Sequence, residues 1–403
     1  MQHRIMRTLC LAGAAAVLVS LAGCGGSGDS NSTTTTTAAP AVFYAHNAVF
    51  SNHTTWAWGA NESGQLGNGG TTASNVPVRV VGFANFSGVA IGASHTLAFQ
   101  KYSTVRAWGY NGFGQLGNGV ITNSSRPVKA GTTLSGVVAV AAGGYHSLAL
   151  DRNGGVWAWG SNALGQLGSS ITAVGLLNSL PVQVPSDQIN GVFLDGVAIA
   201  AGGSHSLAIK ASDGTVWAWG NNNYGQLGSS RSDWSEPKPV SGITGTVVKI
   251  AGGGSHSLAL TSDGTIWAWG YNYFGQLGNG TTTNSTTPVA VTIPGLNGTA
   301  LIAAGLDHSM AYDPLTDTLW VWGYNTYGQL GDGSTTNRTV PKAIPFFSLN
   351  VGGGTLPQIF AVGHHSHARK TNGKWFSWGS NSSGQLGNGT IVDSRVPVPV
   401  SGL

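Results

Sequence analysis

The sequence repeats one string seven times, and this repetition constrains the fold more than any other feature. The string reads W-G-x-N-x-x-G-Q-L-G, and successive copies begin 50 to 60 residues apart. The first glycines of the seven copies are Gly59, Gly109, Gly160, Gly220, Gly270, Gly323 and Gly379. One histidine precedes each of these glycines by 13 to 15 residues, at positions His46, His95, His146, His205, His256, His308 and His365. Seven linked copies indicate one repeat architecture rather than several unrelated domains.

Each unit is predicted to fold into four short strands, because apolar and polar residues alternate in short runs broken by glycine. A proline-bearing strand comes first, as at residues 77–81, and a strand of small apolar residues follows, as at residues 137–142. The H-S-L-A-L and W-A-W-G strands complete the unit, with Asp-Gly hairpin turns between them at Asp213 and Asp263. Such units exclude a helical solenoid and predict an all-β, seven-bladed β-propeller with four-stranded blades spanning residues 41–403.

The two ends of this segment predict how the ring closes. Residues 41–44 correspond to the second strand of a unit, and residues 395–400 match the proline-bearing strand that should precede it. We therefore expect the N- and C-terminal strands to share one blade. Thirteen of the 14 tryptophans fall in the W-x-W-G region, where we expect them to pack between blades.

The remaining letters of the string have backbone explanations. We expect the asparagine either to adopt a left-handed conformation or to cap its loop through the side-chain amide. The glutamine is expected to bond to the loop backbone and the leucine to fill it. The asparagines concerned are Asn61, Asn111, Asn162, Asn222, Asn272, Asn325 and Asn381.

The N-terminus is predicted to be an export signal. Arg4 and Arg7 precede an apolar run that is short for a membrane span, and the run ends in L-A-G followed by Cys24. This ending resembles the lipobox of bacterial lipoproteins, which implies a signal peptide at residues 1–23 and lipidation of Cys24. Residues 24–40 are rich in Gly, Ser and Thr and are expected to form a flexible tether. We expect an exported protein that is lipid-anchored in the bacterial cell envelope, at the outer membrane or cell surface.

Charge excludes one class of partner. Charged residues make up 8% of the chain, and its 18 basic residues show no cluster against the 14 acidic ones. A surface that follows a phosphate backbone needs clustered cations, so we expect no nucleic-acid binding. We expect a monomer.

The motifs G-x-N-x-x-G-Q-L-G-x-G and A-x-G-x-x-H-S, at a spacing near 51 residues, resemble those of the regulator of chromosome condensation repeat family. The resemblance covers residues 41–403 and implies a seven-bladed propeller. It also implies widely divergent functions. The eukaryotic founder is a guanine-nucleotide exchange factor that docks on chromatin, and secreted bacterial members include inhibitors of β-lactamase.

The sequence predicts no enzyme and no cofactor. Carboxylates are dispersed, and Ser206 and Ser257 adjoin histidines on strands where neighbouring side chains face opposite ways. One histidine per blade is a repeat feature, for which we expect hydrogen bonding within the fold. The cluster of His364, His365 and His367 is a weak candidate for Zn²⁺ or Cu²⁺ binding.

The candidates for a binding surface are aromatic residues that do not repeat between copies. They are Tyr110, Phe113, Tyr224, Trp234, Tyr271, Tyr273, Phe274, Tyr324 and Tyr327. Copies four to six are neighbours, so their rings are expected either to form one aromatic sector or to pack against adjacent loops. Two longer excursions, residues 173–180 and 229–236, add further candidates, and the second contains Trp234.

We therefore predict a non-catalytic protein-interaction scaffold whose partner is an unidentified protein. The alternative is a carbohydrate- or cell-wall-binding adhesion protein. Inhibition of a secreted hydrolase such as a β-lactamase, or nucleotide exchange by family transfer alone, are weaker alternatives.

Overall fold

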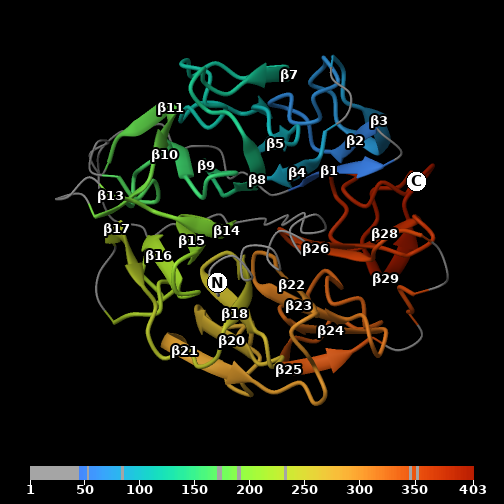
Figure 1. Ribbon diagram of the computed structural model, residues 1–403. Helices are drawn as coiled ribbons and strands as arrows, with labels where there is room; N and C mark the ends of the chain where they lie inside the picture. Colours follow the sequence, from blue (N-terminus) through green and yellow to red (C-terminus); the bar gives the residue numbers. More distant parts are fainter. Residues whose placement is uncertain are drawn as a thin grey trace, which may run out of the picture.

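The chain folds into seven antiparallel sheets arranged in a ring (Figure 1), which confirms the predicted all-β, seven-bladed β-propeller. The computed structural model describes residues 45–51, 54–82, 86–169, 175–187, 192–230, 234–344, 347–350 and 354–403. Six sheets have four strands, and the first has three within these described residues. The lipidation candidate Cys24, the signal and the tether lie outside the described residues.

The strands follow one another in chain order within each blade. Blades 1 to 3 consist of β1 (His46–Ser51), β2 (Thr54–Gly59), β3 (Ser74–Arg79); β4 (Gly88–Ile91), β5 (His95–Phe99), β6 (Val105–Gly109), β7 (Ser124–Lys129); β8 (Val137–Ala142), β9 (His146–Asp151), β10 (Val156–Ser161) and β11 (Leu177–Gln183). A two-stranded hairpin, β12 (Pro185–Asp187) and β13 (Val192–Phe193), separates blade 3 from blade 4.

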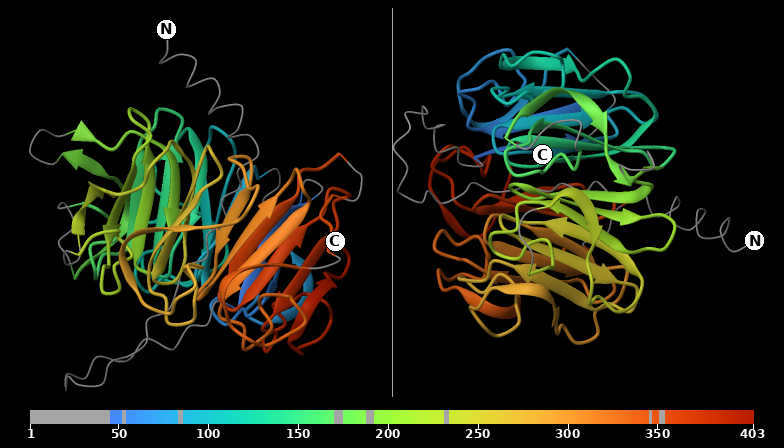
Figure 2. Two further views of the ribbon diagram at one scale, coloured as in Figure 1. Left: turned by 90° about the horizontal axis from the view of Figure 1, so that it is seen from below. Right: turned by 90° about the vertical axis from the view of Figure 1, so that its left-hand side faces the viewer.

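Blades 4 to 7 repeat the same plan. They consist of β14 (Gly196–Ala201), β15 (His205–Lys210), β16 (Val216–Gly220), β17 (Trp234–Pro239); β18 (Val247–Gly252), β19 (His256–Thr261), β20 (Ile266–Gly270), β21 (Ser285–Val291); β22 (Leu301–Ala304), β23 (His308–Asp313), β24 (Thr318–Gly323), β25 (Arg338–Ala343); β26 (Gln358–Val362), β27 (His365–Arg369), β28 (Trp375–Gly379) and β29 (Ser394–Pro399). The blades lie side by side and are inclined to one another (Figure 2).

Within a blade the second strand is the most buried and the outer strand the least. The H-S-L-A-L strand β19 is buried throughout, since neighbouring blades cover both of its faces, whereas the outer strand β21 is largely exposed. The tryptophan of each W-G pair is also fully buried, and its Nε1–H donates to the glutamine carbonyl of the preceding blade, as in Trp269 to Gln226 at 2.8 Å. The first tryptophan of W-A-W-G, such as Trp267, is only partly buried. Packing between blades therefore depends mainly on the second tryptophan.

Residues 41–44, the predicted N-terminal partner of the last strand, lie outside the described residues. Strand β29 pairs with β28 of its own blade, and in the described residues no strand of blade 1 pairs with blade 7. The proline-bearing strand is the last strand of a blade, not the first. It follows its W-G strand after a long loop, which conceals the pairing in the sequence.

The position of proline explains this arrangement. Proline has no N–H to donate, so it is confined to edge strands and bulges of a sheet. Every outer strand carries a proline, and those at the equivalent position are Pro77, Pro127, Pro181, Pro237, Pro288, Pro341 and Pro397. In each blade the pairing of this strand also shifts register beside the W-G glycine, as between Ala57 and Gly59.

A circuit of hydrogen bonds joins the blades around the axis. The Nε2 atom of each ring histidine lies 2.8 to 3.0 Å from a side-chain oxygen of the next blade. In blade 4 this oxygen is the Oγ of Ser257 in blade 5, which itself donates to the carbonyl of Gln226 at 2.8 Å. Because that hydroxyl has one proton and gives it to Gln226, His205 must donate from Nε2–H.

The circuit closes between blades 7 and 1 through a different residue. Asn47 stands where the other blades have serine or threonine. Its Oδ1 accepts from Nε2 of His365 at 3.0 Å, and its Nδ2 donates to the carbonyl of Gln385 at 2.6 Å. Apolar packing supports the same junction, because Trp58 of blade 1 and Phe360 of blade 7 belong to one buried cluster. Within the described residues, side chains thus close the ring between blades 7 and 1.

Candidate functional site

One face of the ring carries the variable residues. Strands within a blade are antiparallel, so the turn between the first and second strands and the loop between the third and fourth emerge on the same face. We call the second of these the W-G loop. Backbone hydrogen bonds join the two elements, as in Tyr324 N–H to the carbonyl of Asp307 at 2.8 Å. The turn between the second and third strands lies on the opposite face.

The W-G loops are rigid because their repeated side chains bond to the loop backbone. The Oδ1 of Asn272 accepts from the N–H of Leu277 at 2.9 Å, and its Nδ2 donates to the carbonyls of Thr281 and Thr283. The Oε1 of Gln276 accepts from the N–H of Phe274 at 3.0 Å. The expected capping roles of asparagine and glutamine are confirmed. None of the seven asparagines has a positive φ, so the left-handed alternative is wrong.

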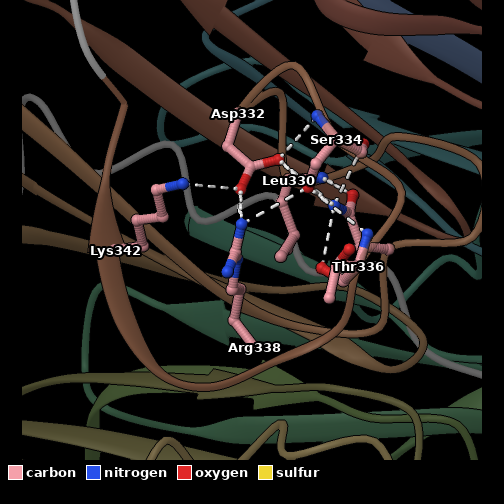
Figure 3. A network of polar contacts seen from close by, with 7 residues as sticks. Leu330, Asp332, Ser334, Thr336, Arg338 and Lys342 are labelled. Carbon is pink, nitrogen blue, oxygen red and sulfur yellow. Dashed lines mark hydrogen bonds and ion pairs between the residues drawn. The ribbon is translucent and has the colours of Figure 1, made fainter.

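Blade 6 stabilises its loop with an ion network (Figure 3). Asp332 replaces the asparagine or serine of other copies, and its carboxylate accepts from Ser334 and, at 3.3 Å, from Asn325. Arg338 and Lys342 lie 2.9 and 3.3 Å from its Oδ2. Burial opposes ionisation, but the hydrogen bonds from Ser334, Arg338 and Lys342 lower the pKa of Asp332 to about 2. The fully buried carboxylate is therefore ionised and fixed in its loop.

The aromatic residues of copies four to six form one continuous surface strip. Consecutive ring centroids are 4.7 Å apart for Tyr224 and Tyr271, 6.2 Å for Tyr271 and Phe274, and 4.5 Å for Phe274 and Tyr324. The contacts continue into blade 7 through His364. We define the aromatic arc as Tyr224, Tyr271, Tyr273, Phe274, Tyr324, Tyr327 and His364. Its most exposed rings are Tyr273 at 66% and Tyr327 at 37% of full exposure.

These contacts decide between the two packings predicted for the rings. The aromatic side chains pack mainly against one another across blade boundaries, and none of the six tyrosines and phenylalanines of the arc is fully buried. A rigid, exposed aromatic strip spans W-G loops of three consecutive blades and reaches a fourth.

A second, smaller aromatic cluster lies at the junction of blades 2 and 3. Tyr110 and Phe113 are 6.2 Å apart, and both contact Tyr145, which lies 5.0 Å from Phe113. Tyr145 and His364 were not among the predicted surface residues. Both occupy the position immediately before a ring histidine, and variation at that position between copies would have identified them.

The remaining predicted positions contribute less to the described face. Trp234 begins the outer strand β17 opposite Gly220, and its side chain lies outside the described residues. The excursion at residues 173–180 is described from residue 175 onward. There Leu176, Leu177 and Leu180 are exposed near the start of β11 in blade 3, whereas the aromatic arc begins in blade 4.

The three histidines proposed as a weak metal site have separate roles. His364 lies 5.3 Å from Tyr327, His365 bonds to Asn47, and the ring of His367 meets Trp58 edge-on at 5.8 Å. Among the described residues, no group of three or more His, Cys, Asp or Glu side chains has an arrangement that would hold a metal ion.

The ring histidines are neutral. Burial lowers the pKa of His95, His146, His205, His256 and His308 to about 3. A neutral imidazole that donates from Nε2 leaves Nδ1 unprotonated, and no hydrogen-bond partner reaches Nδ1 in any of the seven rings. The ring therefore stabilises the fold, as the sequence predicted.

The described part of the chain contains no helix with the length and apolar character needed to cross a membrane.

The fold and its repeated loops define a class, the seven-bladed propellers that present variable side chains from rigidly capped loops. The particular family follows from comparison with known proteins. The family model for the RCC1-like domain matches residues 41–356 and 197–403, and the chain belongs to that family.

Several characterised proteins are similar to this chain. The ultraviolet-B receptor UVR8 of Arabidopsis thaliana is 32% identical over 267 residues, which is 66% of this chain and 58% of UVR8. The E3 ubiquitin-protein ligase HERC2 of Homo sapiens is 33% identical over 272 residues, which is 66% of this chain and 5% of HERC2. The alignments thus span less than two thirds of these relatives.

Solved structures share the architecture. Prp20p from Saccharomyces cerevisiae superimposes with a TM-score of 0.74 at 26% identity, covering 89% of this chain and 88% of Prp20p. Human WBSCR16 superimposes with a TM-score of 0.69 at 26% identity, covering 81% of this chain and 85% of that structure.

Proposed function

We propose that this chain is a non-catalytic protein-interaction module and that the aromatic arc is its contact surface. The continuity of the arc from Tyr224 to His364 is the observation that carries the proposal. Rigid, half-exposed tyrosines lose little conformational entropy when they bind and are enriched among the residues that contribute most to protein interfaces. The Asn and Gln caps hold each loop in place before a partner arrives, which reduces the cost of binding further.

The relatives support an interaction role without defining a partner. The structure of Prp20p is described together with its binding to Gsp1p and histones. UVR8 is named as a receptor and HERC2 as a ubiquitin ligase, so the same propeller occurs in proteins with different activities. A shared fold does not transfer a partner, which has to be argued from the side chains on the loops.

A glycan is the second candidate partner, and one observation favours it. The rings of Tyr271 and Tyr273 are nearly parallel, with an interplanar angle of 14°, and Tyr273 is the most exposed ring of the arc. An exposed aromatic plane suits stacking against a sugar. The protein partner remains our first choice because the strip extends over several blades, further than one or two sugar rings require.

We further propose that the protein acts in the bacterial cell envelope, anchored through lipidated Cys24. The support is the sequence of residues 1–24 alone. Mass spectrometry of the mature protein tests this placement. Intact mass should show diacylation or triacylation at Cys24, and Cys24→Ser should move the protein from the membrane fraction to the soluble fraction. An unmodified Cys24 in the mature protein would overturn the anchor.

Capture from native envelope extract tests the interaction. The full mature chain should retain a specific protein from the extract. Tyr273→Ala and Tyr327→Ala should each reduce the amount retained at least tenfold, because both substitutions remove exposed rings of the arc. Tyr102→Ala is the matched control. Tyr102 is 53% exposed, and it lies in the turn between β5 and β6 on the opposite face.

The same variants separate the two candidates. A glycan array probed with the wild-type chain should give no signal that depends on Tyr273 if the partner is a protein. Capture that is equally reduced by Tyr102→Ala, or unchanged by all three substitutions, would contradict the assignment of this surface.

A further inference from the structure

Asp307 introduces a carboxyl group into the aromatic arc. It occupies the turn between β22 and β23, immediately before the ring histidine His308. The equivalent residues of the other blades are Ala45, Ser94, Tyr145, Ser204, Ser255 and His364. Blade 6 is the one copy with an acidic residue at this position, so the carboxyl group is not needed for the repeat itself.

The repeat geometry places this carboxyl group against the arc. At the equivalent position Tyr145 contacts Tyr110 and Phe113 of the preceding W-G loop. His364 likewise contacts the two rings of its preceding loop, Tyr324 and Tyr327.

By the same relation, Asp307 lies against the W-G loop of blade 5, which carries Tyr271 and Phe274. One contact of that loop confirms the placement, because Nε2 of Gln276 donates to Oδ1 of Asp307 at 3.2 Å. On its other side, the backbone of Asp307 bonds to that of Tyr324.

Asp307 has no cationic partner within the described residues. The ion pairs there involve Asp213, Glu236 and Asp332, and none reaches Asp307. Burial of this unpaired carboxyl group raises its pKa to about 7.

The titratable groups around Asp307 do not supply a charge either. They are the phenols of Tyr271 and Tyr324 and the imidazoles of His308 and His364. Burial lowers the pKa of His308 to about 3 and that of His364 to about 4, so both imidazoles are neutral near pH 7.

We propose that Asp307, together with the rings of Tyr271, Phe274 and Tyr324, is a recognition point for an arginine side chain of the partner protein. The inference rests on the proposed function and specifies which side chain of the partner this part of the surface binds. A planar guanidinium stacks on aromatic faces and donates two N–H groups to one carboxylate. It supplies the positive charge that the carboxyl group lacks, in a site whose other walls are aromatic.

The proposal has a linked consequence for pH. A bound guanidinium favours the carboxylate form of Asp307, so binding releases a proton when that carboxyl group is protonated in the free protein. Affinity for arginine should therefore rise between pH 6 and pH 8. An aromatic surface without this carboxyl group would show no such rise.

The experiment uses the full mature chain with acetyl-arginine amide as the probe, and its uncharged isostere acetyl-citrulline amide as the comparison. Aromatic ¹³C resonances of labelled tyrosine and phenylalanine report binding. Acetyl-arginine amide should shift the resonances of Tyr271, Phe274 and Tyr324, with affinity increasing severalfold from pH 6 to pH 8. Asp307→Asn should weaken binding at least tenfold and abolish the pH dependence. The matched control Glu62→Gln, at an exposed carboxylate in the W-G loop of blade 1, should change neither.

Three results would overturn the proposal. The first is that acetyl-citrulline amide binds as tightly as acetyl-arginine amide, and the second is that acetyl-lysine amide does. The third is that Asp307→Asn binds acetyl-arginine amide as tightly as the wild type. Because Asn keeps the oxygen that Gln276 contacts, the variant should retain the wild-type urea unfolding midpoint, and this is measured alongside. Envelope capture that depends on Tyr273 but not on Asp307 would leave the proposed function standing and remove this inference alone. Envelope capture that depends on neither Tyr273 nor Asp307 would contradict both the proposed function and this inference.

Discussion

His365 donates from Nε2 to Oδ1 of Asn47 across 3.0 Å, and this bond joins residues that are 318 positions apart in the sequence. It completes a circuit in which every other blade uses a hydroxyl group. The asparagine serves because one amide both accepts from the histidine and donates to the carbonyl of Gln385. The most divergent copy of the repeat therefore keeps the contact that the ring requires, with a different functional group.

Removing this amide should weaken the junction between blades 7 and 1. Asn47→Ala leaves the buried Nε2–H of His365 without an acceptor, and we expect a loss of about 1–3 kcal/mol in the free energy of unfolding. Urea unfolding followed by tryptophan fluorescence measures it. Asn153→Ala is the control, because Asn153 is exposed and its observed hydrogen bond uses the backbone N–H. Equal midpoints for Asn47→Ala and the wild type would show that packing alone closes the ring.

The glycine three residues before a ring histidine should not tolerate a side chain. A Cβ at Gly253 would lie 2.2 Å from Cε1 of His256, so the imidazole would have to move away from Ser309. We expect Gly253→Ala to cost at least about 1–3 kcal/mol, as overpacking of a core does. In Gly70→Ala the new Cβ would come no closer than 3.7 Å to Asn68, and this variant should unfold like the wild type. A melting temperature of Gly253→Ala within one degree of wild type would contradict the tight contact.

The ring histidines should make the fold sensitive to acid. Each has a pKa near 6.5 in the unfolded chain, and burial lowers that pKa in the folded chain, to about 3 for six of the seven and well below 6.5 for His365. Between these values the unfolded state binds more protons, so stability is lost as the pH falls below 6.5. Each such histidine contributes about 1.4 kcal/mol per pH unit, and seven together on the order of 10 kcal/mol per unit.

Circular dichroism against pH measures this effect. We expect cooperative unfolding within about two units below pH 6.5, since folded domains are stable by only about 5–15 kcal/mol. His205→Gln keeps a side-chain donor near Ser257 but does not titrate, so the pH dependence should become less steep. A chain that stays folded at pH 4 would show that the rings accept protons without leaving their sites.

Two substitutions at Asp332 should separate its charge from its role as an acceptor. Asp332→Asn keeps an oxygen for Asn325 and Ser334, and Arg338 and Lys342 can hydrate because their side chains are 30% and 43% exposed. We expect this change to cost less than about 1 kcal/mol. Asp332→Ala removes the acceptor inside the loop and should cost about 1–3 kcal/mol. Equal losses in thermal unfolding would mean that the ion pairs, and not the loop hydrogen bonds, account for the contribution of Asp332.

The sequence alone predicted the strands and the roles of the repeated residues, because the constraints on them are local. Alternation identifies H-S-L-A-L as a strand, and the spacing of Asn272 from Leu277 fits a loop closed by its own side chain. The closure of the ring could not be predicted in this way. The proline-bearing strand pairs with a strand on the far side of a loop of about 15 residues, as Ser74 does with Gly59. In a tandem repeat this strand follows one W-G string and precedes the next, so the sequence does not show which of the two blades contains it.

The aromatic surface was predicted in outline and completed by the structure. Comparison of the copies identified Tyr271, Phe274 and Tyr324 because these positions vary within an otherwise constant string. Asp307 and His364 were not predicted to belong to this surface because they lie in a different string, the one that contains the ring histidine. Only the antiparallel geometry of each blade brings the ends of the two strings to the same face.

The prolines of the outer strands also affect how one molecule can contact another. A strand from another molecule that tried to extend a blade at Pro77 or Pro288 would meet a gap in the row of N–H donors and leave one of its own carbonyls unpaired. Copies of the propeller therefore have little tendency to join rim to rim, even when crowded. For the same reason a partner cannot easily bind by adding a strand to a blade. Side chains on the two faces of the ring must therefore recognise it.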